Sequence, residues 1–240
     1  MCTVSVIALP DEVLRLAFNR DELLTRPPAL PPQRVRFRSR EAVMPIDPQS
    51  NGTWIAASDA GLLFALLNVT RGWPPRSTDH SRSRGEIIPW LLHHDTVVRA
   101  VSSFDSFSPT SFAPFDLLVL DHSGGAEVLW DGSRIIRREL SIDFLPLMLT
   151  SSGLGDELVD SPRRALFHQM ITLGECTAAS QDEFHRHRWI DRPYLSVCMN
   201  RSDARTVSRT VIELSEDQAL MFYEPLDPAP HRVRKTAIQV

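Results

Sequence analysis

The first 22 residues, MCTVSVIALPDEVLRLAFNRDE, constrain the fold of this 240-residue chain more than any other stretch. Residues 3–9 and 13–18 are two runs of largely β-branched or apolar side chains, a composition typical of strands. Pro10 and Asp11 end the first run with a turn. Two strands joined by so short a turn pair most simply as an antiparallel hairpin. The start of the chain therefore predicts an antiparallel sheet.

The predicted hairpin places Cys2 opposite residues 19–21, so the thiol and an Arg-Asp pair meet at one end of it. Cysteine is small enough for methionine aminopeptidases to remove Met1, which would leave Cys2 with a thiol and a free α-amino group. The pKa of an α-amine is about 8 and that of a thiol about 8.5, so the amine can act as base for its own residue's nucleophile. Arg20 can lower the thiol pKa, and Asp21 can hold the amine in position. The alternative is that Cys2 is only a small apolar residue at the start of a strand.

The composition indicates an intracellular protein. With 240 residues and 42% hydrophobic content the chain can bury a full core, and we predict one domain over residues 1–240 with residues 225–240 as a peripheral tail. The net charge of −4 gives no sign of a nucleic-acid partner. Three cysteines, odd in number and far apart, favour a reducing compartment, so a cytoplasmic location is expected. No apolar stretch approaches the roughly 18 residues of a membrane span, and no signal peptide is recognisable. No pattern indicates an oligomeric state.

Further strands are predicted along the whole chain. Residues 52–58 and 62–68 form a second pair around an Asp-Ala-Gly turn, and the later run is apolar until Asn68, as in a strand buried on both faces. Asn68 is well placed either to point into a site or to cap the strand. Residues 25–34 hold four prolines and are predicted to form an extended loop. The remaining strands are expected at residues 34–38, 115–121, 126–130, 134–140, 194–199, 205–214 and 218–224.

Helices are expected in two blocks. Residues 81–104 begin with Ser83 and Glu86, which have the spacing of a capping box. A later helix is predicted to begin with Ser161 as N-cap and Pro162 in its first turn, and residues 141–160 and 177–190 are predicted to be loops. Strands and helices segregated into blocks indicate an α+β fold with antiparallel sheets.

Several short segments, in this order along the chain, resemble one known family. They are Met1-Cys2 and residues 18–22 (FNRDE), 52–54 (GTW), 66–68 (LLN), 84–86 (RGE) and 197–198 (VC). The ordered set, which spans residue 1 to about residue 224, is similar to the NRDE family, which includes the transport-and-Golgi-organisation protein 2 group. The resemblance implies the four-layer αββα sandwich of the N-terminal-nucleophile (Ntn) hydrolases.

The resemblance also implies a catalytic site. The positions of Cys2, Arg20, Asp21 and Asn68 are similar to those in the Ntn branch that contains bile salt hydrolases and penicillin V acylase. In that branch the N-terminal cysteine attacks an amide, nearby Arg and Asp residues tune it, and an Asn after a central strand helps to hold the oxyanion. By this resemblance Cys2 is the nucleophile, Arg20 and Asp21 are the tuning pair, and Asn68 is the oxyanion donor, a role worth a few kcal/mol in a transition state.

Four further positions complete the expected site. They are Arg209 as a catalytic support and Asn19, Trp54 and Arg205 as substrate-binding residues. The chain departs from the family pattern near Ser151 and Ser152, because eukaryotic members usually show Leu-Ser-Asn there and this chain lacks that asparagine.

Two functions are therefore expected to compete. The first is hydrolysis of the C–N bond of a small amide by Cys2, without a cofactor or a metal. The second is a non-enzymatic carrier or chaperone for haem or another hydrophobic ligand, with His93, His94 and Cys198 as the first candidate haem ligands. Adjacent histidines on a helix point in different directions, so this pair is a poor chelate.

Overall fold

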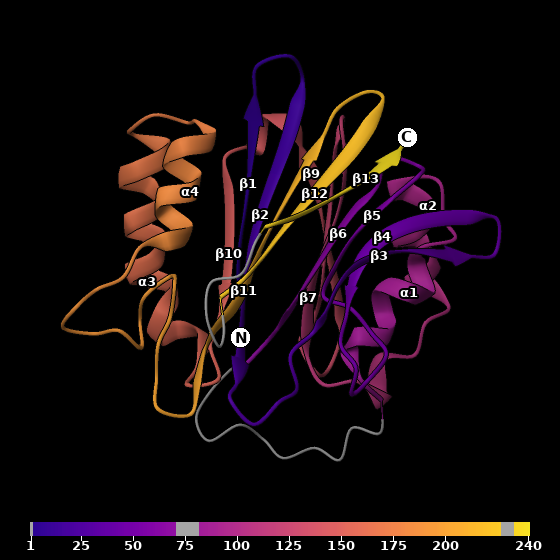
Figure 1. Cartoon of the computed structure of the whole chain (residues 1–240). Helices are drawn as coiled ribbons and strands as arrows, with labels where there is room; N and C mark the ends of the chain where they lie inside the picture. Colours follow the sequence, from indigo (N-terminus) through magenta and orange to yellow (C-terminus); the bar gives the residue numbers. More distant parts are fainter. Residues whose placement is uncertain (1, 71–81, 227–232) are drawn as a thin grey trace.

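Two antiparallel sheets lie face to face, and helices cover the outer face of each sheet (Figure 1). The computed structural model describes residues 2–70, 82–226 and 233–240. The layers run helix, sheet, sheet, helix, so the four-layer αββα sandwich expected from the sequence is confirmed.

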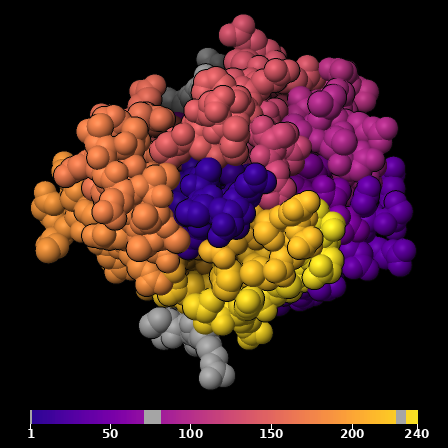
Figure 2. Space-filling view, turned by 90° about the horizontal axis from the view of Figure 1, so that it is seen from above, coloured from indigo at the N-terminus to yellow at the C-terminus, as the bar shows by residue number. Residues whose placement is uncertain are grey.

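The first sheet carries the N-terminal hairpin at its centre. It has six strands in the order β10-β1-β2-β11-β12-β13. Their bounds are β10 Leu147–Ser151, β1 Cys2–Leu9, β2 Val13–Leu23, β11 Ala204–Leu214, β12 Gln218–Pro225 and β13 Arg234–Gln239. The hairpin forms in the predicted register, with Cys2 opposite Arg20. Its turn reaches the surface at the centre of Figure 2, between the α3–α4 side and the closing strands β11–β13.

The second sheet is a meander of seven strands in sequence order, β3 to β9. The strands are β3 Leu30–Phe37, β4 Arg40–Ile46, β5 Ile55–Ser58, β6 Leu63–Asn68, β7 Phe115–Asp121, β8 Gly124–Trp130 and β9 Ile135–Ser141. The side chains of β6 are buried from Leu63 to Leu67, as its continuous apolar run predicts, and Asn68 at its end is partly exposed.

The helices form one group on each side. Outside the second sheet lie α1 Ile87–Leu91 and α2 Val97–Ser102, with the short 3₁₀ turns η1 Arg84–Glu86, η2 Ser103–Asp105 and η3 Pro109–Ser111. Outside the first sheet lie α3 Asp156–Phe167, a π-helical turn η5 His168–Thr172 and α4 Ala178–Arg186, and a 3₁₀ turn η4 Ile142–Phe144 precedes β10. The predicted capping box is confirmed, because Ser83 Oγ accepts from Gly85 N and Glu86 accepts from Ser83 N.

Three hydrophobic clusters join the layers. The central cluster, between the two sheets, includes Val4, Phe18, Ala65 and Ile212. A second joins the seven-stranded sheet to α1 and α2, and a third joins Ile7 of β1 to α3, η5 and α4. Cys2 belongs to the central cluster and is the first residue of β1, so it lies at the strand end of the inter-sheet core.

Several local predictions are wrong. Residues 141–160 were predicted to be a loop but contain β10 and the start of α3, which begins at Asp156 and continues through Pro162. Residues 177–190 contain α4, whose buried face is formed by only three residues, two of them polar, so it lacks an apolar stripe. Residues 194–199 form turns instead of a strand, because the Pro193 carbonyl accepts from the backbone amides of Ser196 and Asn200.

The C-terminal segment also differs from its prediction. It was expected to be a peripheral tail, but β13 pairs with β12 and buries Ile238 in the central core. Part of the proline-rich segment 25–34 belongs to β3, an edge strand, where proline is tolerated. Within the described residues, no helix is long and apolar enough to cross a membrane.

Candidate active site

Cys2 lies between two neighbouring strands at the end of the inter-sheet core. It stands opposite Arg20 of β2 on one side and Ser151 of β10 on the other. The backbone nitrogen of Cys2 donates to Ser151 Oγ over 3.1 Å. The Ser151 side chain therefore holds the nitrogen of the candidate nucleophile in place.

Arg20 lies on the same sheet face as Cys2, because directly opposed residues of an antiparallel pair share a face. Its guanidinium stacks on the Trp54 ring at 4.1 Å from the centroid and donates to Asp47 Oδ2 over 2.9 Å. Asp47 also accepts from Arg26 Nε over 2.8 Å. Arg20 is thus fixed by an aromatic ring and a buried carboxylate beside the thiol.

Asp21, the next residue along β2, is almost fully buried. Its Oδ1 accepts from Thr206 Oγ1 over 2.6 Å, and its Oδ2 lies 4.0 Å from an Arg163 nitrogen. Burial raises the pKa of Asp21, while the Arg163 charge and the Thr206 hydroxyl lower it. Arg163, from α3, is 1% exposed and was not predicted from the sequence.

These residues border a cavity of about 410 Å³, whose walls include Cys2, Arg20, Asp21, Trp54, Asn68 and Arg84. Asn68 enters from the opposing sheet, at the end of β6. Among the described residues its carboxamide has no hydrogen-bond partner, so it can donate to a bound oxygen. The cavity joins a thiol, a free amide donor and several charges.

Burial raises the pKa of the Cys2 thiol, and the charge of the Asp21 carboxyl adds to this effect. The backbone amide of Asp21 and the Arg20 charge lower the pKa but are outweighed. Arg20 therefore acts in the predicted direction without making Cys2 a thiolate. A thiol that is protonated at neutral pH needs a neighbouring base to remove its proton before it can act as a nucleophile.

The segment that carries Trp54 packs directly on the segment that carries Arg84. The backbone nitrogen of Thr53 donates to the Gly85 carbonyl over 3.0 Å. A Cβ atom at Gly52 would lie 2.5 Å from Gly85 backbone atoms, so only glycine allows this approach. The glycines of the GTW and RGE segments thus position two walls of the cavity.

Gly52→Ala is expected to destabilise the protein by about 1–3 kcal/mol, because its methyl group can be accommodated only by moving backbone. Gly85→Ala is the matched comparison, since its Cβ would lie 3.2 Å from the nearest atom, the Gly52 Cα, and it is expected to cost less. Chemical denaturation measures both. Equal stability of Gly52→Ala and wild type would show that the two segments do not pack as described.

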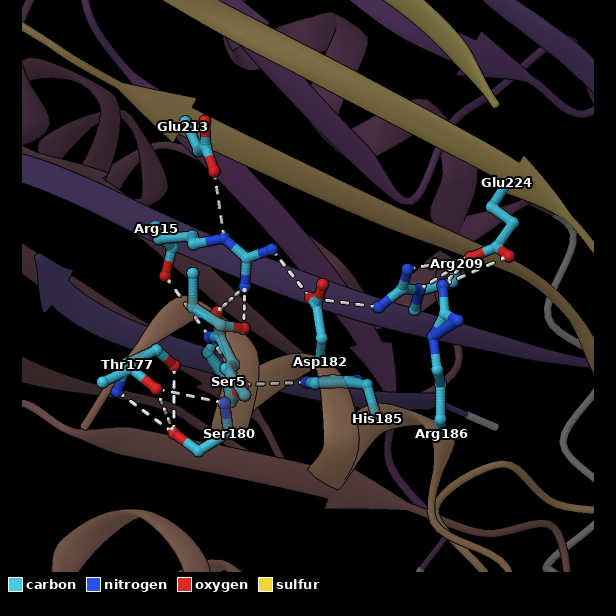
Figure 3. Close-up of polar contacts among 12 residues, drawn as sticks. Ser5, Arg15, Thr177, Ser180, Asp182, His185, Arg186, Arg209, Glu213 and Glu224 are labelled. Carbon is cyan, nitrogen blue, oxygen red and sulfur yellow. Dashed lines mark hydrogen bonds and ion pairs between the residues drawn. The ribbon is translucent and has the colours of Figure 1, made fainter. Parts of the chain in front are cut away.

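Three predicted site residues do not line this cavity. Arg209 lies on the sheet face covered by α4, where it pairs with Asp182 over 3.0 Å and with Glu224 over 2.9 Å (Figure 3). Asn19 is on the same side and donates to the backbone carbonyls of His185 and Val197. Arg205 lies in β11, opposite Glu22.

The candidate haem ligands are not brought together. The rings of His93 and His94 lie 4.0 Å apart after α1, outside the seven-stranded sheet. Cys198 lies outside the six-stranded sheet, where its sulfur accepts from Arg188 over 3.1 Å. Both sheets therefore separate the histidines from the cysteine. Within residues 2–70, 82–226 and 233–240, no group of three or more His, Cys, Asp or Glu side chains could hold a metal ion.

The two-sheet sandwich has the Ntn-hydrolase fold. Its cysteine lies in the hairpin at the centre of the first sheet. Penicillin V acylase from Agrobacterium tumefaciens superposes with a TM-score of 0.55 at 16% identity, over 100% of this chain and 86% of that one. A Caenorhabditis elegans ortholog of N-acylethanolamine-hydrolyzing acid amidase gives 0.57 at 14% identity, over 88% and 92%. A variant of conjugated bile acid hydrolase from Clostridium perfringens gives 0.55 at 11% identity, over 100% and 96%.

The sequence comparison identifies the family. The family model for Transport and Golgi organisation 2 matches residues 1–161, and the chain belongs to this family. A search of curated proteins finds no significant match. The matched region contains Cys2, Arg20, Asp21, Asn68 and Ser151.

Proposed function

We propose that this protein is an N-terminal-cysteine hydrolase that cleaves the C–N bond of a small amide. The observation that carries the proposal is that Cys2, whose nitrogen donates to Ser151 Oγ, lines one cavity with Asn68, whose amide has no hydrogen-bond partner among the described residues. Removal of Met1 would turn the Cys2 nitrogen that Ser151 holds into a free α-amine. That amine is then the base which the buried, protonated thiol requires.

The reaction follows from these positions. The thiol proton moves to the amine as the sulfur attacks the amide carbon, and the carbonyl oxygen becomes an oxyanion to which Asn68 donates. The C–N bond breaks as the resulting ammonium group protonates the leaving nitrogen, which yields a free amine and a thioester on Cys2. Water gives its proton to the same amine, attacks the thioester and releases the acid, and the sulfur takes back its proton.

The buried polar residues around Cys2 have positioning roles in this proposal. Ser151 orients the amine from β10. Asp21 and Arg163 hold the end of β2 next to Cys2, and Arg20 holds the cavity wall through Trp54 and Asp47. Arg209, Asn19 and Arg205 lie outside the cavity, so any effect of theirs on the reaction is indirect.

The structural neighbours support the reaction class, because the three named above are an acylase, an amidase and a bile acid hydrolase. The haem-carrier alternative has no comparable support, since its candidate ligands lie on opposite sides of the sandwich. We also propose a cytoplasmic location, in keeping with the three free cysteines, Cys2, Cys176 and Cys198.

Asn68→Ala tests the proposed oxyanion donor. Release of amine from a panel of N-acyl amides first identifies a working substrate for the processed chain. On that substrate the variant is expected to lose about 10²–10³-fold in kcat with little change in KM, because the donor acts mainly on the transition state. Asn200→Ala, at an exposed position outside the cavity, is the matched control. Unchanged kcat in Asn68→Ala would remove Asn68 from the mechanism.

A further inference from the structure

The charged side chains around the cavity are almost all paired. Asp47 is held by Arg20 and Arg26 at 2.9 Å and 2.8 Å. Glu22 lies 3.2 Å from Arg20 and 3.6 Å from Arg26. Asp47 and Glu22 are therefore neutralised by Arg20 and Arg26, and the third acid of this wall, Asp21, lies 4.0 Å from Arg163.

The other two arginines of the cavity wall differ from each other. Arg82, which is half exposed, is paired with Glu86 over 2.6 Å. Arg84 has no carboxylate within 4.0 Å among the described residues, and its one hydrogen bond runs from Nη1 to the Pro114 carbonyl over 2.9 Å. In the part of the chain that the structure describes, Arg84 is thus a guanidinium in the cavity wall without a carboxylate partner.

Burial lowers the pKa of Arg84, and the negative charge of Glu22, together with that of Cys2 when its thiol is ionised, opposes this. An arginine stays protonated in proteins, so its charge is retained at a desolvated position. Arg84 and Cys2 both line the same cavity. A substrate bound at Cys2 would therefore lie within the field of Arg84.

We propose that Arg84 forms a carboxylate-binding subsite, and that the preferred substrates are amides carrying one carboxylate close to the scissile bond, as in N-acyl amino acids. The inference rests on the proposed function. A planar guanidinium matches a carboxylate through two parallel hydrogen bonds, which are stronger than those between neutral groups. Among the described residues Arg84 is the one cavity arginine without a carboxylate partner, and one such cation is balanced by one negative charge, so a monoanion fits this cavity better than a dianionic phosphate ester.

The test separates binding from turnover. Titration calorimetry on the Cys2→Ala variant compares N-hexanoyl-alanine with N-hexanoyl-alaninamide, which differ only in the charge of the terminal group. The acid is expected to bind at least about 10-fold more tightly, in line with a charge-assisted hydrogen-bond pair. Adding Arg84→Gln is expected to remove this preference by weakening the acid alone. Adding Arg84→Lys is expected to keep part of the preference for the acid, because lysine retains the positive charge but lacks the two parallel donors of a guanidinium.

Arg82→Gln is the matched control, because Arg82 lies two positions away and already has Glu86 as its partner. It is expected to leave the acid-to-amide ratio within about twofold, a difference well below the tenfold step of 1.4 kcal/mol. Equal affinities for the two ligands, no saturable binding of the acid, or a preference that survives Arg84→Gln would each overturn the subsite. Absence of amide cleavage by the wild-type chain would instead contradict the proposed function and leave this binding result standing.

Discussion

Replacing Cys2 by alanine is expected to abolish amide hydrolysis. The only thiol on the cavity wall would be lost, while Ser151, Asn68 and Arg84 would remain in place. Loss of the nucleophile in a serine protease lowers kcat on the order of 10⁶-fold. Amine release measured with the substrate found above gives the rate, and binding to the same variant gives the second readout.

The loss should not come from unfolding. Cys2 is small and 7% exposed, so exchange for alanine removes only one sulfur from the end of the core, and the melting temperature is expected to change little. Alanine is also small enough to allow removal of Met1. Cys198→Ala is the matched control, since this buried cysteine lies outside the six-stranded sheet. Full activity of Cys2→Ala would show that another group attacks the substrate.

Replacing Arg163 by methionine is expected to lower the free energy of unfolding by about 3–5 kcal/mol, the usual cost of removing one partner of a buried ion pair. Arg163 donates to the backbone carbonyls of Leu195 and Ser196 over 3.0 Å and 2.7 Å. It also donates to the hydroxyls of Thr3 and Thr150, each over 2.8 Å. Methionine would leave these acceptors without that donor.

The matched control is Arg164→Met, at the next position of α3. Arg164 is largely exposed and pairs with Asp160 one turn earlier, a contact that contributes little. Its replacement is expected to change the unfolding free energy by less than about 0.5 kcal/mol. Urea denaturation distinguishes the two variants, and a similar small effect at both positions would contradict the role given to Arg163.

The effect of Arg163→Met should also depend on pH. Burial already raises the pKa of Asp21, and loss of the Arg163 charge would raise it further. A carboxyl group with a raised folded-state pKa contributes stability that is fully present below its unfolded pKa and is lost as pH rises through the folded pKa. The destabilisation by Arg163→Met is therefore expected to be larger at pH 8 than near pH 4. With Asp21→Asn as background, this pH dependence should disappear.

The sequence predicts much of the strand framework because its signals are local. The run 62–68 is apolar enough to indicate a strand buried on both faces, and the hairpin turn fixes which residue faces Cys2. In contrast, α4 presents Gln181 and His185 to the sheet, so its buried side is partly polar and lacks the helical periodicity. The strands β4, β10 and β13 were not predicted, because β4 contains Pro45 and each of the other two follows proline-containing sequence.

The residues of the candidate site were predictable to the same extent as the strands. Cys2, Arg20 and Asp21 follow from the hairpin and the family resemblance, and Asn68 from the end of a buried strand. Arg209 was misplaced because its side chain points to the outer sheet face, where α4 supplies Asp182 as its partner. Arg163 contacts Thr3, which lies 160 residues earlier, and Ser151 accepts from Cys2 across 149 residues. No local sequence pattern reveals contacts between positions so far apart.

Intact mass spectrometry of the chain in a Cys176→Ala background, before and after brief iodoacetamide treatment at pH 7, tests the central claim most directly. Cys176 is the exposed cysteine of the three, so its removal leaves two buried thiols, of which Cys2 lines the candidate active-site cavity and would have a free amine beside it once Met1 is removed. The account predicts a chain that has lost Met1 and takes up one label, at Cys2. A chain that keeps Met1, or a processed chain whose Cys2 stays unlabelled, would contradict it.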